Sequence, residues 1–236
     1  MVYKWINKAR LVVFPPRCRL CLATGVHGRD LCSDCLRELP WLVQACERCA
    51  LPIPDATDPG VCAGCLARPP VLDACHALFG YQPPVDRWIH ALKFGQDLAA
   101  ARMLGQLLAD RLTPRRAGQV PSLLPVPLHP RRLRQRGYNQ ALELARPLLR
   151  NGWSLNRCNC QRRRHTAAQA GLPARDRRRN LSDAFSVNSR LDGQHILLID
   201  DVMTTGATLN ELARVLKAAG AERVEAWVIA RALKQR

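Results

Sequence analysis

The sequence of 236 residues has no apolar run near the roughly 18–20 residues that a membrane-spanning helix needs. Its first stretch, MVYKWINKARLVVFPPRC, carries basic residues but only a four-residue apolar run. It therefore lacks the apolar segment and the small-residue cleavage site of a secretory signal. These absences exclude a spanning helix and favour a cytoplasmic protein.

Acidic residues are also scarce, with 19 Asp and Glu against 36 Lys and Arg, for a formal net charge of +17. Such an excess favours anionic partners, namely nucleic acid, nucleotides or an acidic membrane surface. Apolar residues make up 47% of the chain. The length and this apolar content suit one mid-sized domain and a small module.

Cysteine is abundant, and in a cytoplasmic chain eleven cysteines indicate metal binding rather than disulfides. Eight of them form four C-x-x-C pairs, whose spacing suits tetrahedral Zn²⁺. The simplest arrangement is two consecutive four-cysteine ribbons holding structural zinc, although an interleaved pairing of one or two ions and a disulfide or thiol-redox segment are alternatives. We predict a zinc-ribbon module over residues 1–70 and a second domain over 71–236. The predicted ligands are Cys18, Cys21, Cys32, Cys35, Cys46, Cys49, Cys62 and Cys65.

Beyond the cysteines, apolar patterning predicts an α/β fold with a mostly parallel sheet flanked by helices. The pattern between 85 and 112 is helical and divides at Gly95, and His90 is expected to pack near Trp88. Further helices are predicted over 139–149 and 207–220, and strands over 71–81, 122–129, 184–187, 195–200 and 224–230.

The segment ILLIDDVMTTGAT (196–208) places two carboxylates, Asp200 and Asp201, where a buried strand ends. The following turn leads into a helix, whose free N–H groups suit a phosphate. Two carboxylates beside a phosphate make sense if the ligand also carries a cis-diol. A ribose 5-phosphate fits both parts, and the alternative is a strand followed by an acidic capping turn.

This segment resembles the phosphoribosyl pyrophosphate (PRPP) motif of type I phosphoribosyltransferases. The whole chain resembles the ComF/GntX-like family, through the paired cysteines and the segments WIHALKFGQD (88–97), LLPVPLHPRRLRQRGYNQALELA (123–145) and RRRHTAAQAGLPARDRRRNLSDAF (162–185). The resemblance implies a type I phosphoribosyltransferase fold with a small N-terminal zinc-ribbon module that binds zinc through four cysteines. It also implies a role in natural competence or in the use of DNA as a nutrient.

The resemblance further implies the parts that individual residues play. Asp200 and Asp201 would hold the ribose hydroxyls as the candidate catalytic pair, and Mg²⁺ would accompany the pyrophosphate. Thr166, Gln169, Arg177 and Asn180 match a second polar signature of the family. Some purine phosphoribosyltransferases carry an acidic residue at the position of Thr204, where it aids proton transfer at the nucleobase. Because this chain has threonine there, it offers no candidate residue for that proton transfer. The candidate ligand-binding residues are Thr204, Thr205, Gly206, Ala207 and Thr208 for the 5-phosphate and His129, Arg131 and Arg132 for the pyrophosphate.

Residues 131–180 contain fourteen arginines, no lysine and two acids. Arginine binds phosphate bidentately and stacks on bases, so we expect single-stranded DNA to run across the mouth of the site. Tyr138 and Trp153 are the only aromatics there, which favours backbone contacts with a steep salt dependence. A solvated basic face is the alternative. The candidate nucleic-acid contacts are Arg134, Arg136, Tyr138, Arg162, Arg163, Arg164, Arg177, Arg178 and Arg179.

Three functions are compatible with these features. The favoured one is a DNA-uptake or DNA-utilization protein that binds single-stranded DNA and a PRPP-like or nucleotide ligand. The second is an active phosphoribosyltransferase, which transfers ribose 5-phosphate to a base-like acceptor and releases pyrophosphate. The third is a zinc scaffold that docks a DNA-uptake helicase or a membrane channel protein.

Overall fold

The computed structural model describes residues 15–53, 60–112, 121–164 and 184–233. The chain divides into two compact units, residues 1–40 and 41–236, and each is described by itself. The domain boundary predicted at residue 70 stays a prediction, because it marks the end of the double zinc ribbon rather than a division between compact units.

Over its described residues, 15–40, the first unit contains a cysteine knuckle and one short helix. The N–H of Leu22 donates to the carbonyl of Cys18, 2.9 Å away, and the N–H of Cys18 donates to the carbonyl of Ala23 at 2.8 Å. These bonds turn the chain so that Cys18 and Cys21 share one side. Helix α2 (Ser33–Arg37) then begins at Cys32, whose sulfur accepts a hydrogen bond from the N–H of Cys35.

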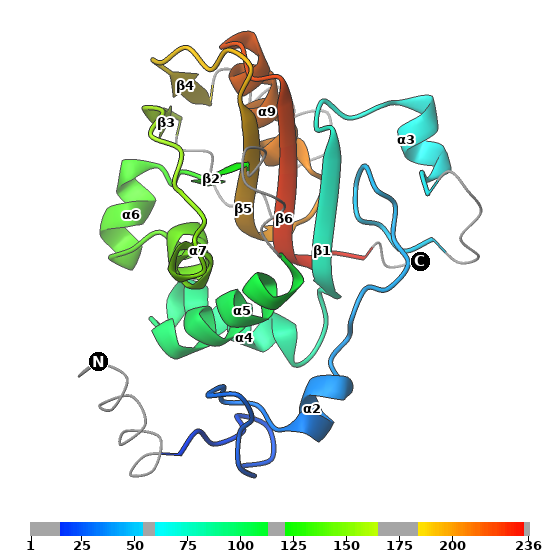
Figure 1. Cartoon of the computed structure of the whole chain (residues 1–236), viewed down its shortest axis with the longest axis vertical. Helices are drawn as coiled ribbons and strands as arrows, with labels where there is room; N and C mark the ends of the chain where they lie inside the picture. Colours follow the sequence, from blue (N-terminus) through cyan, green and yellow to red (C-terminus); the bar gives the residue numbers. More distant parts are fainter. Residues whose placement is uncertain (1–14, 54–59, 113–120, 165–183, 234–236) are drawn as a thin grey trace. The chain divides into compact units, whose positions relative to one another are not determined.

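The second unit is built on a four-stranded parallel sheet with the order β1-β6-β5-β2 (Figure 1). The strands are β1 (Ala74–Gly80), β2 (Ser122–Pro125), β5 (His195–Met203) and β6 (Arg223–Arg231). Because the central strands are buried on both faces, their sequences are almost continuously apolar. Strands β3 (Cys160–Arg162) and β4 (Phe185–Val187) form a separate antiparallel pair.

Helices cover both faces of this sheet. The predicted helical stretch divides at Gly95 into α4 (Val85–Phe94) and α5 (Leu98–Arg111), as expected. Helix α7 (Gln140–Arg150) continues through Pro147 and packs on α5, β5 and β2. Helix α9 (Ala207–Ala218) packs on β6 from the other face, where it meets Ile196, Leu198 and Val224 in one apolar cluster (Figure 1).

The path of the chain fixes where this sheet can bind a ligand. After β2 the chain passes through α7 to Leu155, which pairs in parallel with Leu123 on the outer edge of β2. After β5 it passes through α9 to β6, in the opposite direction across the sheet. The direction therefore switches between β2 and β5. In open α/β sheets, ligands bind beyond the carboxyl ends of the strands at such a switch point.

The second cysteine cluster is part of the core of the second unit. Cys46, Cys49 and Ala50 are buried in the same apolar cluster as Cys75 of β1 and Leu209 of α9. The N–H of Cys75 also donates to the carbonyl of Glu47 at 2.7 Å. Helix α3 (Ala63–Ala67) carries the last cysteine of this cluster. This ribbon therefore packs on the sheet domain as one of its layers.

Candidate functional site

The eight paired cysteines form two clusters, and the consecutive pairing predicted from the sequence is confirmed. Cys18, Cys21, Cys32 and Cys35 bring their sulfurs within 4.8 Å of one another, and so do Cys46, Cys49, Cys62 and Cys65. Sulfurs bound tetrahedrally to zinc at about 2.3 Å lie about 3.8 Å apart. The Sγ–Sγ distances of 3.6 Å for Cys21 and Cys32 and 3.7 Å for Cys49 and Cys62 match this spacing. Both clusters therefore suit structural zinc.

The first cysteine of each cluster is placed to form a thiolate, the form that binds zinc. Burial raises the pKa of the Cys18 thiol, but the N–H groups of Cys21 and Cys32 outweigh burial and lower this pKa to about 6. Burial also raises the pKa of the Cys46 thiol, but the N–H groups of Cys62 and Arg48 outweigh burial and lower this pKa to about 7. Four sulfurs around each ion leave no coordination position for a substrate, which is typical of a structural site.

The two adjacent aspartates lie at the switch point of the sheet. Strand β2 ends at Pro125, which pairs with Ile199 of β5, so the next two residues of β5 extend past its end. Strand β5 then continues to Met203, paired with β6, and is three residues longer than the sequence predicts. Successive side chains of a strand point to opposite faces. The side chains of Asp200 and Asp201 therefore point to opposite faces of the sheet at this end of β5.

Lys93 neutralises one of these acids. Its Nζ lies 2.8 Å from Oδ1 of Asp201, and both side chains are largely shielded from water. Lys93 belongs to the segment WIHALKFGQD, but no role was predicted for this lysine. A lone lysine at the end of an amphipathic helix was the signal available, and only the fold shows that it meets Asp201.

Asp200 has a different environment. Burial, reinforced by the negative charge of Asp201, raises the pKa of Asp200 to about 7. The N–H of Asp201 donates to Oδ1 of Asp200 at 2.9 Å, which favours the ionised form. The two carboxyl groups therefore differ near neutral pH, where Asp200 is close to its midpoint and Asp201 is ion-paired.

The turn after β5 has the geometry of an anion-binding loop. Thr204 and Thr205 are exposed, and Gly206 has φ = 79° and begins α9. A side chain at Gly206 would collide with the methyl group of Met203, so both space and backbone conformation require glycine here. The N–H of Ala207 and the exposed threonine hydroxyls are near the positive end of the α9 dipole.

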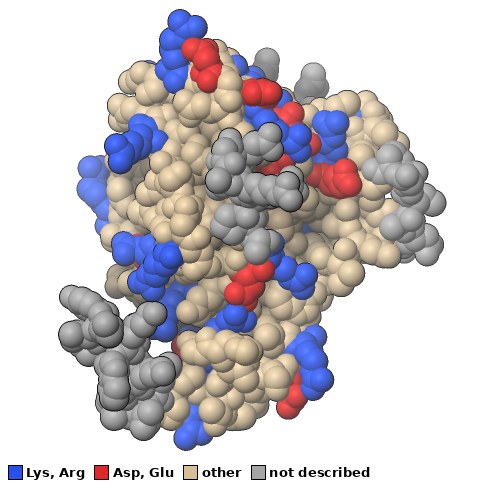
Figure 2. Space-filling model, in the orientation of Figure 1, with Lys and Arg blue, Asp and Glu red and all other residues tan. Residues whose placement is uncertain are grey.

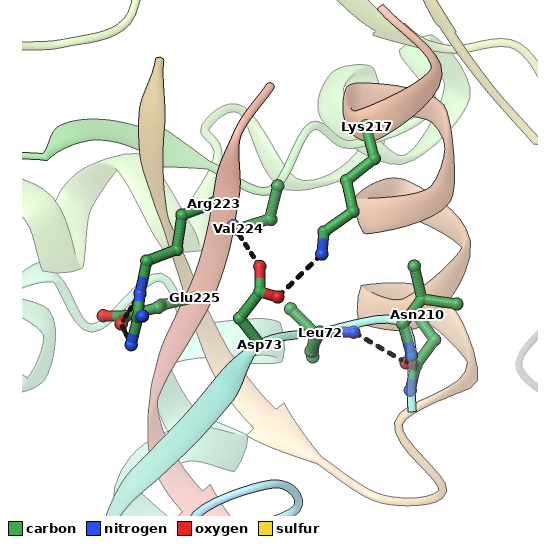
Figure 3. Close-up of polar contacts among 8 residues, drawn as sticks. Leu72, Asp73, Asn210, Lys217, Arg223, Val224 and Glu225 are labelled. Atoms are coloured by element: carbon green, nitrogen blue, oxygen red, sulfur yellow. Dashed lines mark hydrogen bonds and ion pairs between the residues drawn. The ribbon is translucent and has the colours of Figure 1, made fainter. Parts of the chain in front are cut away.

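Asn210 holds this turn against the segment that leads into β1. Its Nδ2 donates to the carbonyl of Gly206 at 3.0 Å. Its Oδ1 accepts from the N–H of Val71 at 2.7 Å and from the N–H of Leu72 at 3.3 Å (Figure 3). In the same region, the Asp73 carboxylate accepts hydrogen bonds from Lys217 and from the N–H of Val224, both at 2.7 Å. Although burial opposes it, these bonds lower the pKa of Asp73.

Arg231 holds the turn from the other side. It is 5% exposed, and its guanidinium donates to the carbonyls of Met203 at 3.0 Å and of Thr204. It also donates to the carbonyl of Cys49 at 2.7 Å. The buried Arg231 side chain thus joins the second cysteine cluster to the turn after β5. Arg231 was not among the predicted site residues, although a charged residue at the end of an apolar strand was a usable signal.

The segment after β2 forms a short helix, α6 (Pro130–Arg136), which is not among the predicted helices. His129 begins it, with Nδ1 accepting from the N–H of Arg131 at 3.2 Å, and Gly137 ends it with φ = 81°. Proline after a capping residue and glycine seven residues later were the signals for this helix. Arg131 is exposed and Arg132 is half-buried.

The predicted nucleic-acid residues have different environments. Arg134, Arg163 and Arg164 are exposed. Figure 2 shows basic side chains along the flank where α6 and α7 lie. By contrast, Arg162 is 9% exposed and lies near Asp200, and burial lowers its pKa. Burial also lowers the pKa of Arg136, which is near both aspartates. These two side chains therefore contribute positive charge to the acid pair.

Tyr138 packs against α4. Its hydroxyl donates to the carbonyl of Leu92, and burial raises the pKa of Tyr138. This bond fixes the end of α4, where Lys93 lies. A contact between Tyr138 and nucleic acid stays a prediction. Arg177, Arg178 and Arg179, with Thr166, Gln169 and Asn180, lie outside the described residues.

Two family models match the chain. The double zinc ribbon domain matches residues 10–71, and the phosphoribosyl transferase domain matches residues 154–236, which include the acid pair and the turn. The chain is 36% identical over 221 residues to the DNA utilization protein YhgH of Salmonella typhi, covering 92% of this chain and 96% of that protein. The chain belongs to the ComF-like family.

Two further relatives extend the similarity within this ComF-like family. Competence protein F of Haemophilus influenzae is 33% identical over 226 residues, which cover 91% of this chain and 95% of that protein. Competence protein ComFC of Streptococcus pneumoniae is 26% identical over 155 residues, with coverage of 66% and 67%. The sheet, its flanking helices and the cysteine clusters agree with the predicted phosphoribosyltransferase fold and zinc-ribbon module. Among the described residues, no helix is long and apolar enough to cross a membrane.

Proposed function

We propose that this ComF-like protein acts in DNA uptake or DNA utilization in the cytoplasm, and that it binds a PRPP-like ligand and single-stranded DNA. The role in DNA use is carried over from the names of relatives that match nearly the whole chain. One structural observation supports the ligand in particular. The acid pair and the glycine turn lie within one strand end at the switch point of a parallel sheet.

In this proposal, the acid pair and the glycine turn bind different parts of the ligand. The diol of the ribose would donate hydrogen bonds to Asp200 and Asp201, and the 5-phosphate would accept them from the turn at Thr204 to Thr208. His129, Arg131 and Arg132 are proposed to face the pyrophosphate from α6. Lys93 and Arg136 reduce the repulsion between the acids and a polyanionic ligand.

Mg²⁺ fits this site as a companion of the ligand. Within the described residues, the clusters of three or more potential metal-binding side chains consist of cysteines, and the acid pair supplies only two carboxylates. Mg²⁺ is commonly bound through one or two carboxylates together with substrate phosphates. Asp200 and Asp201 would hold it through the diol or through water, and the ion would neutralise the pyrophosphate.

Calorimetric titration of Mg²⁺–PRPP tests the ligand site. We expect micromolar binding by the zinc-loaded protein and its loss in Asp200→Asn/Asp201→Asn. The matched control is Asp34→Asn/Asp192→Asn, which removes the same charge from carboxylates whose side chains are 74% and 63% exposed. Equal weakening in both double variants would show that the loss is not specific to the acid pair. No binding by a folded wild type would contradict the ligand proposal.

Transfer of ribose 5-phosphate to an acceptor is the second candidate, favoured by the match to the phosphoribosyl transferase domain. Thr204 provides no general base for such a transfer at neutral pH, so an acceptor that needs no deprotonation is expected. Release of pyrophosphate from PRPP across an acceptor panel, abolished by Asp201→Asn, would support turnover. Absence of release by a protein that binds PRPP would leave a binding function. Docking of a helicase or channel protein is a further role that a pull-down would test.

A further inference from the structure

Phe94 is the most exposed aromatic side chain among the described residues. It ends α4 with 65% of its surface exposed, whereas Tyr81, the other strongly exposed aromatic, is at 39%. The preceding residue, Lys93, forms the ion pair with Asp201. Few aromatics occur among the arginines of residues 131–180. The fold supplies one from a different segment.

Packing of α4 does not explain this exposure. The buried stripe of the helix consists of Val85, Trp88, Ile89 and Leu92. Phe94 lies off that stripe, one turn after His90, which is also exposed and whose ring centroid is 4.7 Å away at an angle of 44°. This corrects the expectation that His90 is packed. Burying a phenylalanine side chain stabilises a protein, and most of that gain is absent at this exposed position.

A cation completes the arrangement. The guanidinium carbon of Arg136 lies 5.4 Å from the centroid of the Phe94 ring. Arg136 is also close enough to Asp200 and Asp201 for their charges to act on it. A planar aromatic ring with an arginine beside it is the combination that stacks a nucleobase and attracts its phosphate.

We propose that Phe94, together with Arg136, is a stacking platform for a nucleobase at the edge of the ligand site. The proposal rests on the proposed function for its position beside the ribose. The base could belong to a DNA strand or to a free base or mononucleotide, because both present the same aromatic face. The structure thus assigns a base-binding role to a residue outside the arginine-rich stretch.

The test compares two strands of equal charge. A short labelled oligothymidylate and an abasic strand with the same number of phosphates are titrated against the wild type, Phe94→Ala and Phe94→Trp. We expect the wild type to prefer the oligothymidylate, Phe94→Ala to lose about tenfold in affinity for that strand alone, and Phe94→Trp to keep the preference. Tyr81→Ala is the matched control and should behave as the wild type. Equal loss on both strands in Phe94→Ala, or no loss on either, would overturn the proposal.

A second arm identifies the source of the base. Fluorescence of Phe94→Trp is followed during titration with the oligothymidylate, with thymidine 5′-monophosphate and with ribose 5-phosphate. Quenching by the mononucleotide but not by the sugar phosphate supports a small ligand, and quenching by the strand alone supports DNA. No quenching by either base-containing probe contradicts stacking. Because PRPP carries no base, its titration into the wild type reports failure of the phosphoribosyl site separately.

Discussion

Nζ of Lys93 on α4 lies 2.8 Å from Oδ1 of Asp201 on β5. This ion pair joins a helix on one face of the sheet to the acid pair at the switch point. Of the two acids, Asp201 is ion-paired, and Asp200 is the one whose pKa lies near neutral pH. The electrostatics of the site therefore depend on a residue that lies far from the acid pair in the sequence.

Replacing Lys93 should change the ionisation of Asp200. The positive charge of Lys93 lowers the pKa of Asp200, against the larger effect of burial. We therefore expect Lys93→Met to raise that pKa and to weaken Mg²⁺–PRPP binding about tenfold at neutral pH. Carboxyl ¹³C NMR across a pH series measures the first effect. Arg102→Met removes a charge from an exposed position of α5 and should cause neither change.

Stability should depend on pH through Asp200. Its pKa is about 7 in the folded protein, against about 3.9 for aspartate in an unfolded chain. Between these values the folded state holds a proton that the unfolded state has released, so the contribution of Asp200 to stability falls as pH rises. Relative to wild type, Asp200→Asn should gain about 3–4 kcal/mol in free energy of unfolding from about pH 4 to about pH 8. Urea denaturation at both ends checks this, and an unchanged difference would contradict it.

The two cysteine clusters should affect the turn after β5 differently. Cys46→Ser/Cys49→Ser removes ligands from the cluster that Arg231 joins to the turn, whereas Cys18→Ser/Cys21→Ser acts in the first unit. We expect each variant to lose about one of two zinc ions. Faster hydrogen exchange at Met203 to Thr205 is expected only in the former. Equal exchange in the two variants would show that the second cluster does not support the turn.

Arg231 should be the most costly arginine of β6 to replace. Arg231→Met would leave the carbonyls of Cys49 and Thr204 without their buried donor and would leave the carbonyl of Met203 with only the N–H of Ala232. We expect a loss of about 2–4 kcal/mol in the free energy of unfolding. Arg223→Met, at the start of the same strand, should cost less than about 1 kcal/mol, because the Arg223 side chain is 54% exposed in its ion pair with Glu225. Thermal unfolding of both variants makes the comparison.

The exposed arginines should contribute to DNA binding through charge. For Arg163→Gln/Arg164→Gln, we expect the slope of log affinity against log salt to fall by about 0.7 for each phosphate that the variant no longer neutralises. Arg214→Gln on α9, whose side chain is 51% exposed, serves as the control and should leave the slope unchanged. Salt-insensitive binding by the wild type would contradict the proposed backbone contacts.

Local patterns were sufficient to predict much of this architecture. Apolar patterns and cysteine spacing predicted the four strands of the parallel sheet, strand β4, the division of the helical stretch at Gly95 and the consecutive cysteine clusters. The three-residue strand β3 was not predicted. Lys93, Asn210 and Arg231 could not be assigned, because their partners are distant in sequence. Helix α6 was missed for a different reason: its seven residues are too polar and too few to show an apolar period.

The hydrogen bonds that join the second ribbon to the sheet domain bear on how such a protein could have been assembled. A cut after Pro70 would separate Arg231 from the carbonyl of Cys49 and Cys75 from the carbonyl of Glu47. The second ribbon is thus not an appendage that recombination could exchange freely between proteins. The breakpoint that preserves these contacts falls between Pro40 and Trp41, where the compact units divide. Only the first ribbon could therefore be exchanged by recombination as a separate module.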